Sequence, residues 1–163
     1  MTNPVLVCHE SINIIGIQIR TSNQQEKDQT TGKIPQHWQR FFTENIASKI
    51  PNKINQTQQI ALYTEYEGDH TGEYSLIIGV PVTTLQTIPT GMVGMSITPS
   101  TYSKFTYTGK MPDIVIMGWE NIWDYFSHNQ NNQSHKRTFH ADFELYDSAK
   151  PDCVEIYIGV REF

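Results

Sequence analysis

Two glutamates stand in strand-like segments near the C-terminal end of the chain, in the run FELYDSAKPDCVEIYIGV (143–160). Glu144 and Glu155 each have aromatic and aliphatic neighbours, and a turn separates the two segments. Strand faces beside a core usually exclude carboxylates, because a buried charge is costly unless a partner compensates it. A carboxylate among aromatic rings suits a cationic aromatic molecule, since the cation offsets the cost of burial.

Strand alternation divides the second of these segments into two faces. One face is wholly aliphatic (154, 156, 158 and 160) and suits packing beneath a helix, whereas the other carries Glu155, Tyr157 and Gly159. The second face is either solvated, in which case Glu155 needs no partner, or it lines a groove with Glu155 at its base. Alternation does not assign Glu144 to a face, because its register against Glu155 depends on the intervening turn.

The chain repeats itself at a spacing of 80 residues. The run YTEYEGDHTGEYSLIIGV (63–80) aligns with 143–160 without a gap, so that Tyr63 falls on Phe143 and Gly79 falls on Gly159. Helical apolar patterns at 34–46 and 114–126 precede these two hairpins, and strand patterns at 12–20, 91–97 and 102–109 precede the helices.

The predicted fold class is therefore α+β. We expect a duplicated βαββ unit with pseudo-twofold symmetry, antiparallel sheets, one main helix per half and a groove between the halves. A single domain would span residues 1–163, with its two halves at about 1–83 and 84–163. The polar segments 21–33 and 128–137 are predicted to be loops. The histidines near the second loop match no usual metal-ligand spacing, so no metal site is expected.

Composition and charge narrow the classes of partner. The formal net charge is -5 and the chain has no basic block, which argues against direct nucleic-acid binding. No apolar run is long enough for a transmembrane helix, and the first residues do not resemble a signal peptide. Cys8 and Cys153 form no disulfide or metal pattern, so we interpret them as free thiols of a cytoplasmic protein. No cofactor is expected.

Four motifs together resemble the GyrI-like, AraC-type effector-binding domain family. They are YTEYEGD…YSLIIGVPV, YSKFTYTG, W..IWDYF and DFELYD…VEIYIGV, and they cover nearly the whole chain from about Ile12. The terminal pair FELYD and EIYIGV is the most specific part, although Gly159 stands where the family usually has proline. The resemblance implies a stand-alone domain, without a DNA-binding helix-turn-helix, that binds cationic amphipathic aromatic molecules in its groove.

The resemblance also assigns roles to individual residues. Glu144 falls on the glutamate of a family motif FExY, and Glu155 and Tyr157 fall on the glutamate and tyrosine of EIY. Looser candidates for the groove walls are Tyr63, Phe105, Tyr107 and Trp119. Three tryptophans also fit the apolar stripes of the two helices, for which core packing is the preferred interpretation: Trp38, Trp119 and Trp123.

Two other functions remain open from the sequence. Some GyrI-like proteins hydrolyse strained cyclopropanes of natural products, and in that case Glu155, Tyr157 and Tyr63 would be the catalytic residues. No nucleophile–base motif such as GxSxG supports that chemistry. Other relatives bind a protein partner such as a regulator or gyrase, for which the acidic outer surface would serve. Small-molecule binding of broad specificity is favoured, because rings and carboxylates alone fix no hydrogen-bond pattern.

Overall fold

The computed structural model describes residues 3–128 and 134–162. Within these residues the strands are β1 (Val5–His9), β2 (Ile12–Ser22), β3 (Gln58–Thr64), β4 (Glu73–Val82), β5 (Val93–Ile97), β6 (Ser100–Thr108), β7 (His135–Asp147) and β8 (Cys153–Glu162). The helices are α1 (Asn23–Lys27), α2 (Ile34–Thr43), α3 (Ile46–Lys49) and α4 (Asp113–His128). The strands expected from the sequence are all present, and β1 is an addition that the sequence analysis did not assign.

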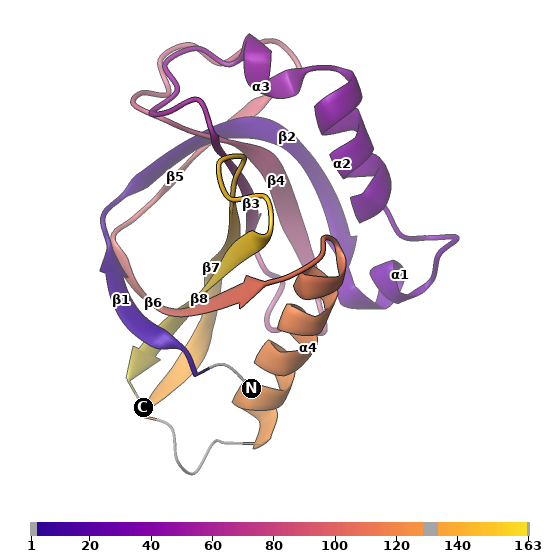
Figure 1. The fold of residues 1–163 in the computed structure, drawn as a ribbon, viewed down its shortest axis with the longest axis vertical. Helices are drawn as coiled ribbons and strands as arrows, with labels where there is room; N and C mark the ends of the chain where they lie inside the picture. Colours follow the sequence, from indigo (N-terminus) through magenta and orange to yellow (C-terminus); the bar gives the residue numbers. More distant parts are fainter. Residues whose placement is uncertain (1–2, 129–133, 163) are drawn as a thin grey trace.

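The antiparallel strands form a closed ring, in the hydrogen-bonded order β1-β6-β8-β7-β3-β4-β2-β5. The two ends of this order meet, because β1 leads directly into β2 and β5 leads directly into β6. His9 pairs with Ser100 and Ile12 pairs with Ile97, so the β1·β6 and β2·β5 ladders keep one register across the interruption. They act as one long ladder that closes the sheet into a barrel (Figure 1).

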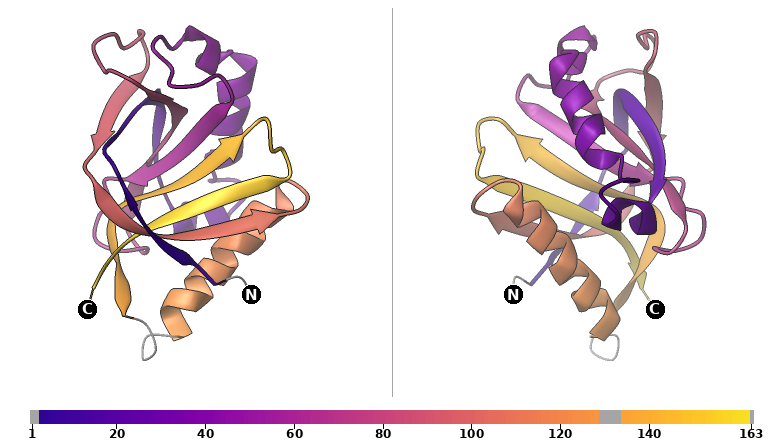
Figure 2. Two further views of the ribbon diagram at one scale, coloured as in Figure 1. Left: turned by 60° about the vertical axis from the view of Figure 1, so that its left-hand side comes forward. Right: turned by 90° about the vertical axis from the view of Figure 1, so that its right-hand side faces the viewer.

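The barrel has the pseudo-twofold symmetry that the sequence repeat predicted. One half is β2, α2, β3 and β4, and the other is β6, α4, β7 and β8, so each half is a βαββ unit. Equivalent strands occupy equivalent places in the strand order: β6, β8 and β7 follow one end, as β2, β4 and β3 follow the other. The two halves meet where β3 pairs with β7. The main helix of each half, α2 or α4, lies on the same side of the strands (Figure 2). The expected α+β class and duplicated unit are confirmed.

The repeat is not gapless, which corrects the alignment made from the sequence. Tyr63 pairs with Leu76 in the first hairpin, and Glu144 pairs with Ile156 in the second. Leu76 and Ile156 are 80 residues apart, whereas Tyr63 and Glu144 are 81 apart, so Tyr63 corresponds to Glu144 rather than to Phe143. A slip of one residue moves a side chain to the other face of a strand, so a gapless alignment gives the wrong face for the β7 residues that it matches to β3.

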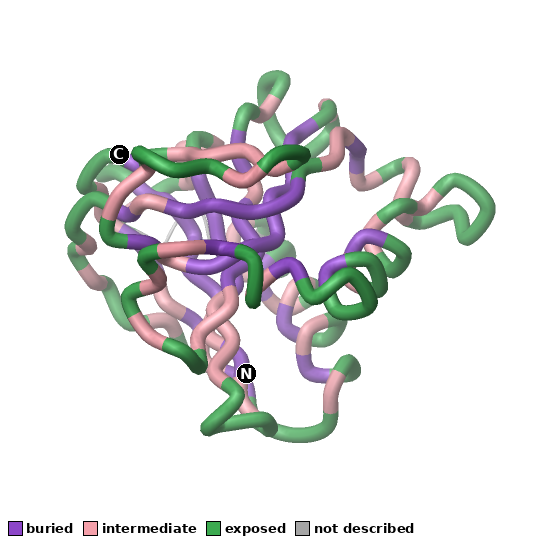
Figure 3. The backbone as a smooth tube through the Cα atoms, turned by 90° about the horizontal axis from the view of Figure 1, so that it is seen from above, coloured by how far each residue is buried: buried purple, intermediate pink, exposed green. Residues whose placement is uncertain are grey.

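Both faces of the strands are packed. Outside the barrel, one cluster lies beneath α2 and α3 and another lies beneath α4; the second includes Ile156 and Ile158, as expected. The opposite face, predicted to line a groove, is the barrel interior and holds a third cluster: Ile12, Ile14, Ile60, Leu62, Ile77, Ile97, Tyr102, Ala141, Phe143 and Tyr157. Figure 3 shows the buried backbone concentrated in the central strands. The groove prediction was therefore wrong about the face.

The polar segment 21–33 is not simply a loop. Its first two residues complete β2, and the next five form α1. The carboxylate of Glu26 accepts hydrogen bonds from the backbone N–H groups of Lys33 and Ile34. It thereby caps the first turn of α2, whose N-cap residue Lys33 has no capping side chain of its own. In the other polar segment, 129–133 lie outside the described residues, and β7 begins at His135.

Three further observations concern sites that the sequence analysis considered. Cys8 and Cys153 are free thiols. No group of three or more potential metal ligands occurs in the part of the chain that the structure describes. Among residues 3–128 and 134–162, the helices lack the length and apolar character needed to span a membrane.

The packing of β8 beneath α4 gives a first testable prediction. Ile158 is fully buried, so Ile158→Ala should lower the free energy of unfolding by about 2–5 kcal/mol through lost burial and a residual cavity. Ile54 is 57% exposed, and Ile54→Ala should change the free energy by less than about 0.5 kcal/mol. Urea unfolding of both variants measures the difference. Equal effects would mean that β8 does not pack beneath α4 as described.

Candidate ligand-binding site

A cavity of about 240 Å³ opens outside the barrel, above the seam where β3 meets β7. Residues of α4 form one wall, and residues of α1, α2 and the β3–β4 hairpin form the other. The lining residues are Asn23, Glu26, Ile34, Tyr63, Tyr66, His70, Tyr74, Val115, Ile116, Trp119, Glu120, Trp123, Arg137 and Glu144. The cavity thus lies between the halves, as expected, but on the helix side of the strands.

Glu144 is the buried carboxylate of this cavity, with 1% of its surface exposed. Its Oε2 accepts hydrogen bonds from the Tyr63 hydroxyl at 2.8 Å and from the Trp119 indole N–H at 2.7 Å. Its Oε1 accepts a hydrogen bond from the Tyr146 hydroxyl at 2.6 Å. All three donors are neutral, and no ion pair to Glu144 is found among the described residues. The carboxylate is hydrogen-bonded, but its charge is not balanced.

Burial raises the pKa of Glu144, and the hydrogen bonds from Tyr146, Trp119 and Tyr63 lower it by a smaller amount. Burial and the nearby Glu144 charge together raise the pKa of Tyr63 and of Tyr146 well above the ordinary tyrosine value. Both phenols therefore keep their protons at neutral pH and remain hydrogen-bond donors. A group that carries charge without a counter-ion in a buried site is the arrangement that a ligand cation can complete.

Strand alternation explains why these side chains meet. Asp142, Glu144 and Tyr146 occupy alternate positions of β7, and Glu144 pairs with Ile156, whose side chain faces α4. On the neighbouring strand, Tyr63 pairs with Asp142, which brings the phenol to the same face. Trp119 reaches the carboxylate from above, on α4. One helix and two strands therefore hold the three donors around one acceptor.

A second buried acid lies one step along β7. Asp142 is fully buried and forms an ion pair with Arg137, with 2.7 Å between Oδ2 and Nη2. It also accepts hydrogen bonds from the Tyr66 hydroxyl and from the backbone N–H of Gly159. Unlike Glu144, Asp142 has its counter-ion within the protein. The two acids of β7 thus differ in charge balance, and Glu144 is the one whose charge an external cation could balance.

Aromatic rings cover the cavity walls. Tyr63 contacts Tyr74 and Trp119, with ring centroids 5.5 and 5.3 Å apart, and Tyr66 contacts Tyr74 at 5.8 Å. Trp119 is followed one helical turn later by Trp123, which is 38% exposed and lies at the cavity rim. Edge-on and tilted rings around a carboxylate present both faces and edges to a flat aromatic ligand.

The residues expected at the site fall into two groups. Glu144, Tyr63 and Trp119 are brought together at the cavity. Glu155 lies on the other face of β8, where its Oε2 is 2.9 Å from the Lys104 Nζ and its Oε1 is 3.4 Å from the Tyr157 hydroxyl. Glu155 already has a counter-ion, and it does not line the cavity.

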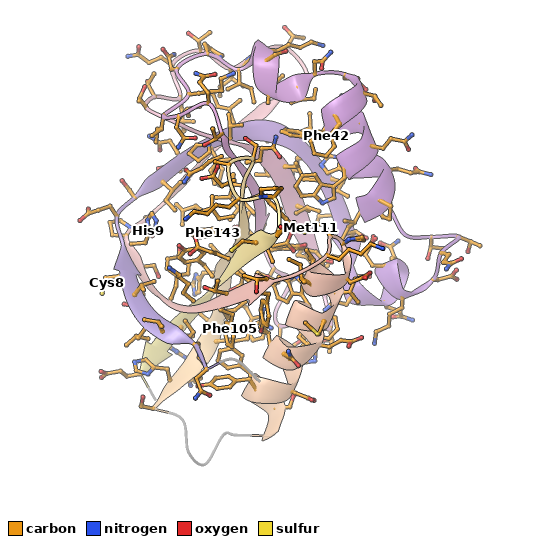
Figure 4. All side chains as sticks on the ribbon, viewed as in Figure 1. Cys8, His9, Phe42, Phe105, Met111 and Phe143 are labelled. Atoms are coloured by element: carbon orange, nitrogen blue, oxygen red, sulfur yellow. The ribbon has the colours of Figure 1, made fainter. Side chains whose placement is uncertain are left out.

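The remaining expected residues are packed elsewhere. Tyr157 stacks on Phe143 inside the barrel, with 4.4 Å between the ring centroids. Phe105 and Tyr107 belong to the cluster beneath α4, because β6 turns its odd-numbered side chains toward the helix. Figure 4 shows Phe143 within the ring of strands and Phe105 near α4. Their aromatic character reflects core packing rather than a cavity wall.

Several cavity residues were not identified from the sequence. Tyr66 and Tyr74 were not proposed as site residues, Trp123 was assigned to the core, and Arg137 was assigned to a loop. Trp123 carried a usable signal, since it follows Trp119 by four residues and both would lie on one helical face. Arg137 carried none, because its partner Asp142 is reached across an irregularity in the β7·β8 ladder between these two residues.

Comparisons with known proteins agree with one another on the fold and on the protein family. The family model Cass2, described as integron-associated effector binding protein, matches residues 6–160. The structure of integron cassette protein VCH_CASS2, from the mobile metagenome of Vibrio cholerae, superposes with a TM-score of 0.81 at 30% identity. The superposition covers 98% of this chain and 96% of the VCH_CASS2 chain.

Two further relatives match over most of their length. YobU of Bacillus subtilis (strain 168), whose name suggests a role in transcriptional regulation, is 28% identical over 152 residues, which is 90% of this chain and 91% of YobU. A structure of SAV2435 bound to tetraphenylphosphonium superposes with a TM-score of 0.74 at 23% identity, covering 97% of this chain and 93% of that chain. At that identity the likeness to SAV2435 concerns the fold.

Glu144→Gln removes the charge of this side chain and keeps its shape. A glutamine carbonyl at the Oε2 position can accept from Tyr63 and Trp119, as the carboxylate does. The glutamine NH₂ at the Oε1 position can donate to the Tyr146 hydroxyl, because a hydroxyl both donates and accepts. Glu144→Gln therefore keeps one hydrogen bond to each of the three neighbours, while the Tyr146 O–H and the second amide N–H lose an acceptor at this site, a cost that does not change with pH.

We expect the stability of Glu144→Gln relative to the wild type to increase as the pH rises. The native pKa of Glu144 is raised, so between the ordinary value of about 4.3 and that native pKa the folded state binds more protons than the unfolded state. The contribution of Glu144 to the free energy of unfolding of the wild type is fully present below the ordinary pKa, and it is lost as the pH rises through the native pKa. Urea unfolding of both proteins from about pH 4 to 8 measures it. A stability of Glu144→Gln relative to the wild type that stays constant or falls as the pH rises would contradict a raised pKa.

Proposed function

The chain belongs to the family of integron-associated effector-binding proteins, and from this premise we propose that it binds small organic cations bearing aromatic rings. The cation would lie in the cavity above Glu144. The observation that carries the proposal is the buried carboxylate itself, which accepts three hydrogen bonds from neutral donors and has no counter-ion among the described residues.

Electrostatics favour a cation over an anion or a neutral ligand. The cavity lining carries three carboxylates, Glu26, Glu120 and Glu144, against one guanidinium, Arg137. The Arg137 charge is already balanced by Asp142 behind it. A unit charge about 5 Å from Glu144 would gain roughly 3 kcal/mol at an effective dielectric constant near 20. That gain is equivalent to about a hundredfold in affinity before desolvation of the ligand is subtracted.

The aromatic side chains that donate hydrogen bonds to Glu144 increase the attraction of the cavity for a cation. Tyr63 and Trp119 donate hydrogen bonds to the carboxylate, and such donation polarises the donor ring toward greater electron density. A ligand cation above these rings would gain cation–π attraction of about 0.5–2 kcal/mol per ring. The carboxylate can thus act on a ligand through its donors, even though only 1% of its own surface is exposed.

A bulky aromatic cation is the appropriate probe. SAV2435, which shares the fold, has a solved structure in which it is bound to tetraphenylphosphonium. That ion carries a positive charge shielded by four rings and has no hydrogen-bonding group, so it isolates the effects of charge and aromatic contact. Triphenylmethane, which has three phenyl rings on one tetrahedral carbon, is a neutral comparison of smaller size.

We expect the wild type to bind tetraphenylphosphonium and Glu144→Gln to bind it at least tenfold more weakly, because the counter-charge is lost. Weak binding of triphenylmethane should be nearly unchanged by the same substitution. Fluorescence quenching of Trp119 and Trp123, which line the cavity, provides the titration signal. Equal loss of affinity for the charged and neutral compounds would contradict a role for the Glu144 charge.

Glu155→Gln is the matched control. It removes a glutamate charge from the same hairpin, at a residue that is paired with Lys104 and lies away from the cavity. The affinity of this variant for tetraphenylphosphonium should stay within about twofold of the wild type, a change of under 0.5 kcal/mol. If Glu155→Gln weakened binding as strongly as Glu144→Gln, the ligand would not be seated in this cavity.

A further inference from the structure

We infer that Arg137 gives the cavity a second recognition element: a hydrogen-bond donor for a neutral acceptor, such as a carbonyl oxygen, on the cationic aromatic ligand. This inference rests on the proposed function, since it concerns a further group on the same ligand. It narrows the ligand class from aromatic cations in general to aromatic monocations that carry an acceptor on one ring.

The inference begins with an unpaired donor. The side chain of Arg137 is only 8% exposed, yet it lines the cavity. Its Nε is buried and has no hydrogen-bond partner among the residues that the structure describes. A buried N–H of a charged group that lacks an acceptor is costly, and a ligand oxygen that reached Nε through a small local adjustment of the cavity wall would remove that cost on binding.

The internal partner of Arg137 does not satisfy this donor. Nη2 and Nε lie on the same edge of the guanidinium plane, the edge that can bind a carboxylate through two parallel hydrogen bonds. Asp142 uses only Oδ2 on this edge, at 2.7 Å from Nη2, because its Oδ1 accepts the Gly159 backbone N–H at 2.8 Å. The Nε half of the edge is left for another acceptor.

The donor is held in position before any ligand arrives. One face of the guanidinium is covered by the Phe139 ring, with 4.2 Å from Cζ to the ring centroid. The Asp142 carboxylate accepts a hydrogen bond from Nη2 of the guanidinium. Asp142 is itself fixed by hydrogen bonds from the Tyr66 hydroxyl and the Gly159 backbone N–H. A ligand that uses this donor therefore does not have to order a flexible side chain, which favours tight binding.

Charge and spacing indicate what the acceptor must be. Asp142 and Arg137 already form a balanced pair, so an anionic ligand group would add uncompensated negative charge beside Asp142. A neutral oxygen avoids that repulsion. Asp142 and Glu144 are two residues apart on one strand face, which corresponds to about 7 Å. A substituent on one ring of a cation seated above Glu144 can span this separation.

The test uses two nearly isosteric ligands. Tetraphenylphosphonium with one para-acetyl group offers a carbonyl oxygen, whereas the para-isopropenyl compound replaces that oxygen with a methylene group. We expect the wild type to bind the acetyl compound about tenfold more tightly, the effect of one hydrogen bond to a charged donor. Without such a bond, the more apolar isopropenyl compound would bind at least as well, and that result in calorimetry would overturn the inference.

Arg137→Lys assigns the donor to its residue. Lysine keeps the positive charge beside Asp142 but lacks the guanidinium edge, so the ratio of the affinities for the acetyl and isopropenyl compounds should fall to about one in this variant, whatever its affinity for unsubstituted tetraphenylphosphonium. Arg161→Lys, at an exposed position of β8, is the matched control and should retain the preference. A preference that persists in Arg137→Lys would overturn the assignment, and the wild-type comparison remains decisive if that variant does not fold.

The outcome for the unsubstituted ion separates this inference from the proposed function. If tetraphenylphosphonium binds and the acetyl compound has no advantage, the cation site stands and the Arg137 donor is rejected. If tetraphenylphosphonium itself does not bind, the proposed function fails and the inference fails with it.

Discussion

The site depends on the cost of keeping one carboxylate charged inside the protein. Glu144 is buried, and among the described residues its hydrogen-bond donors are two phenols and an indole. Burial of a charge without a counter-ion is unfavourable, and a protein core offers cheaper side chains for the same volume. The position makes physical sense if the missing counter-ion arrives with a ligand. The neighbouring Asp142, which has Arg137 as its counter-ion, illustrates the arrangement that stability alone would select.

The duplicated architecture supplies the place for this carboxylate. Because β3 and β7 meet on the pseudo-twofold axis, the helices of the two halves lie on either side of the seam and leave a cavity between them. The equivalent positions Tyr63 and Glu144 have diverged in type, so one half contributes a donor and the other contributes the acceptor. The barrel interior is closed by its own cluster of side chains, which leaves the helix side for a ligand.

The sequence predicted the fold better than the site. Periodicity located both main helices and most strands, and the family match confirms the resemblance drawn from the terminal motifs. The gapless repeat failed by one residue, because a hairpin loop can change length without altering the apolar pattern of its strands. The face of Glu144 stayed open for a different reason, because its register against Glu155 depends on the turn between β7 and β8. Glu155 was expected in a groove, yet its partner Lys104 is on β6 and is adjacent only through strand pairing, which a single sequence does not reveal.

The protonation of Glu144 is the most direct measure of this account. Carbon-13 NMR of protein labelled at the glutamate side-chain carboxyl carbon, with the signal assigned by its loss in Glu144→Gln, follows this group alone. The account predicts a native pKa above the ordinary value of about 4.3 in the free protein, and a clear decrease when tetraphenylphosphonium is bound, because a nearby cation favours the charged form. An ordinary pKa in the free protein, or a pKa that the ligand leaves unchanged, would contradict the claim that Glu144 is the counter-charge of the ligand.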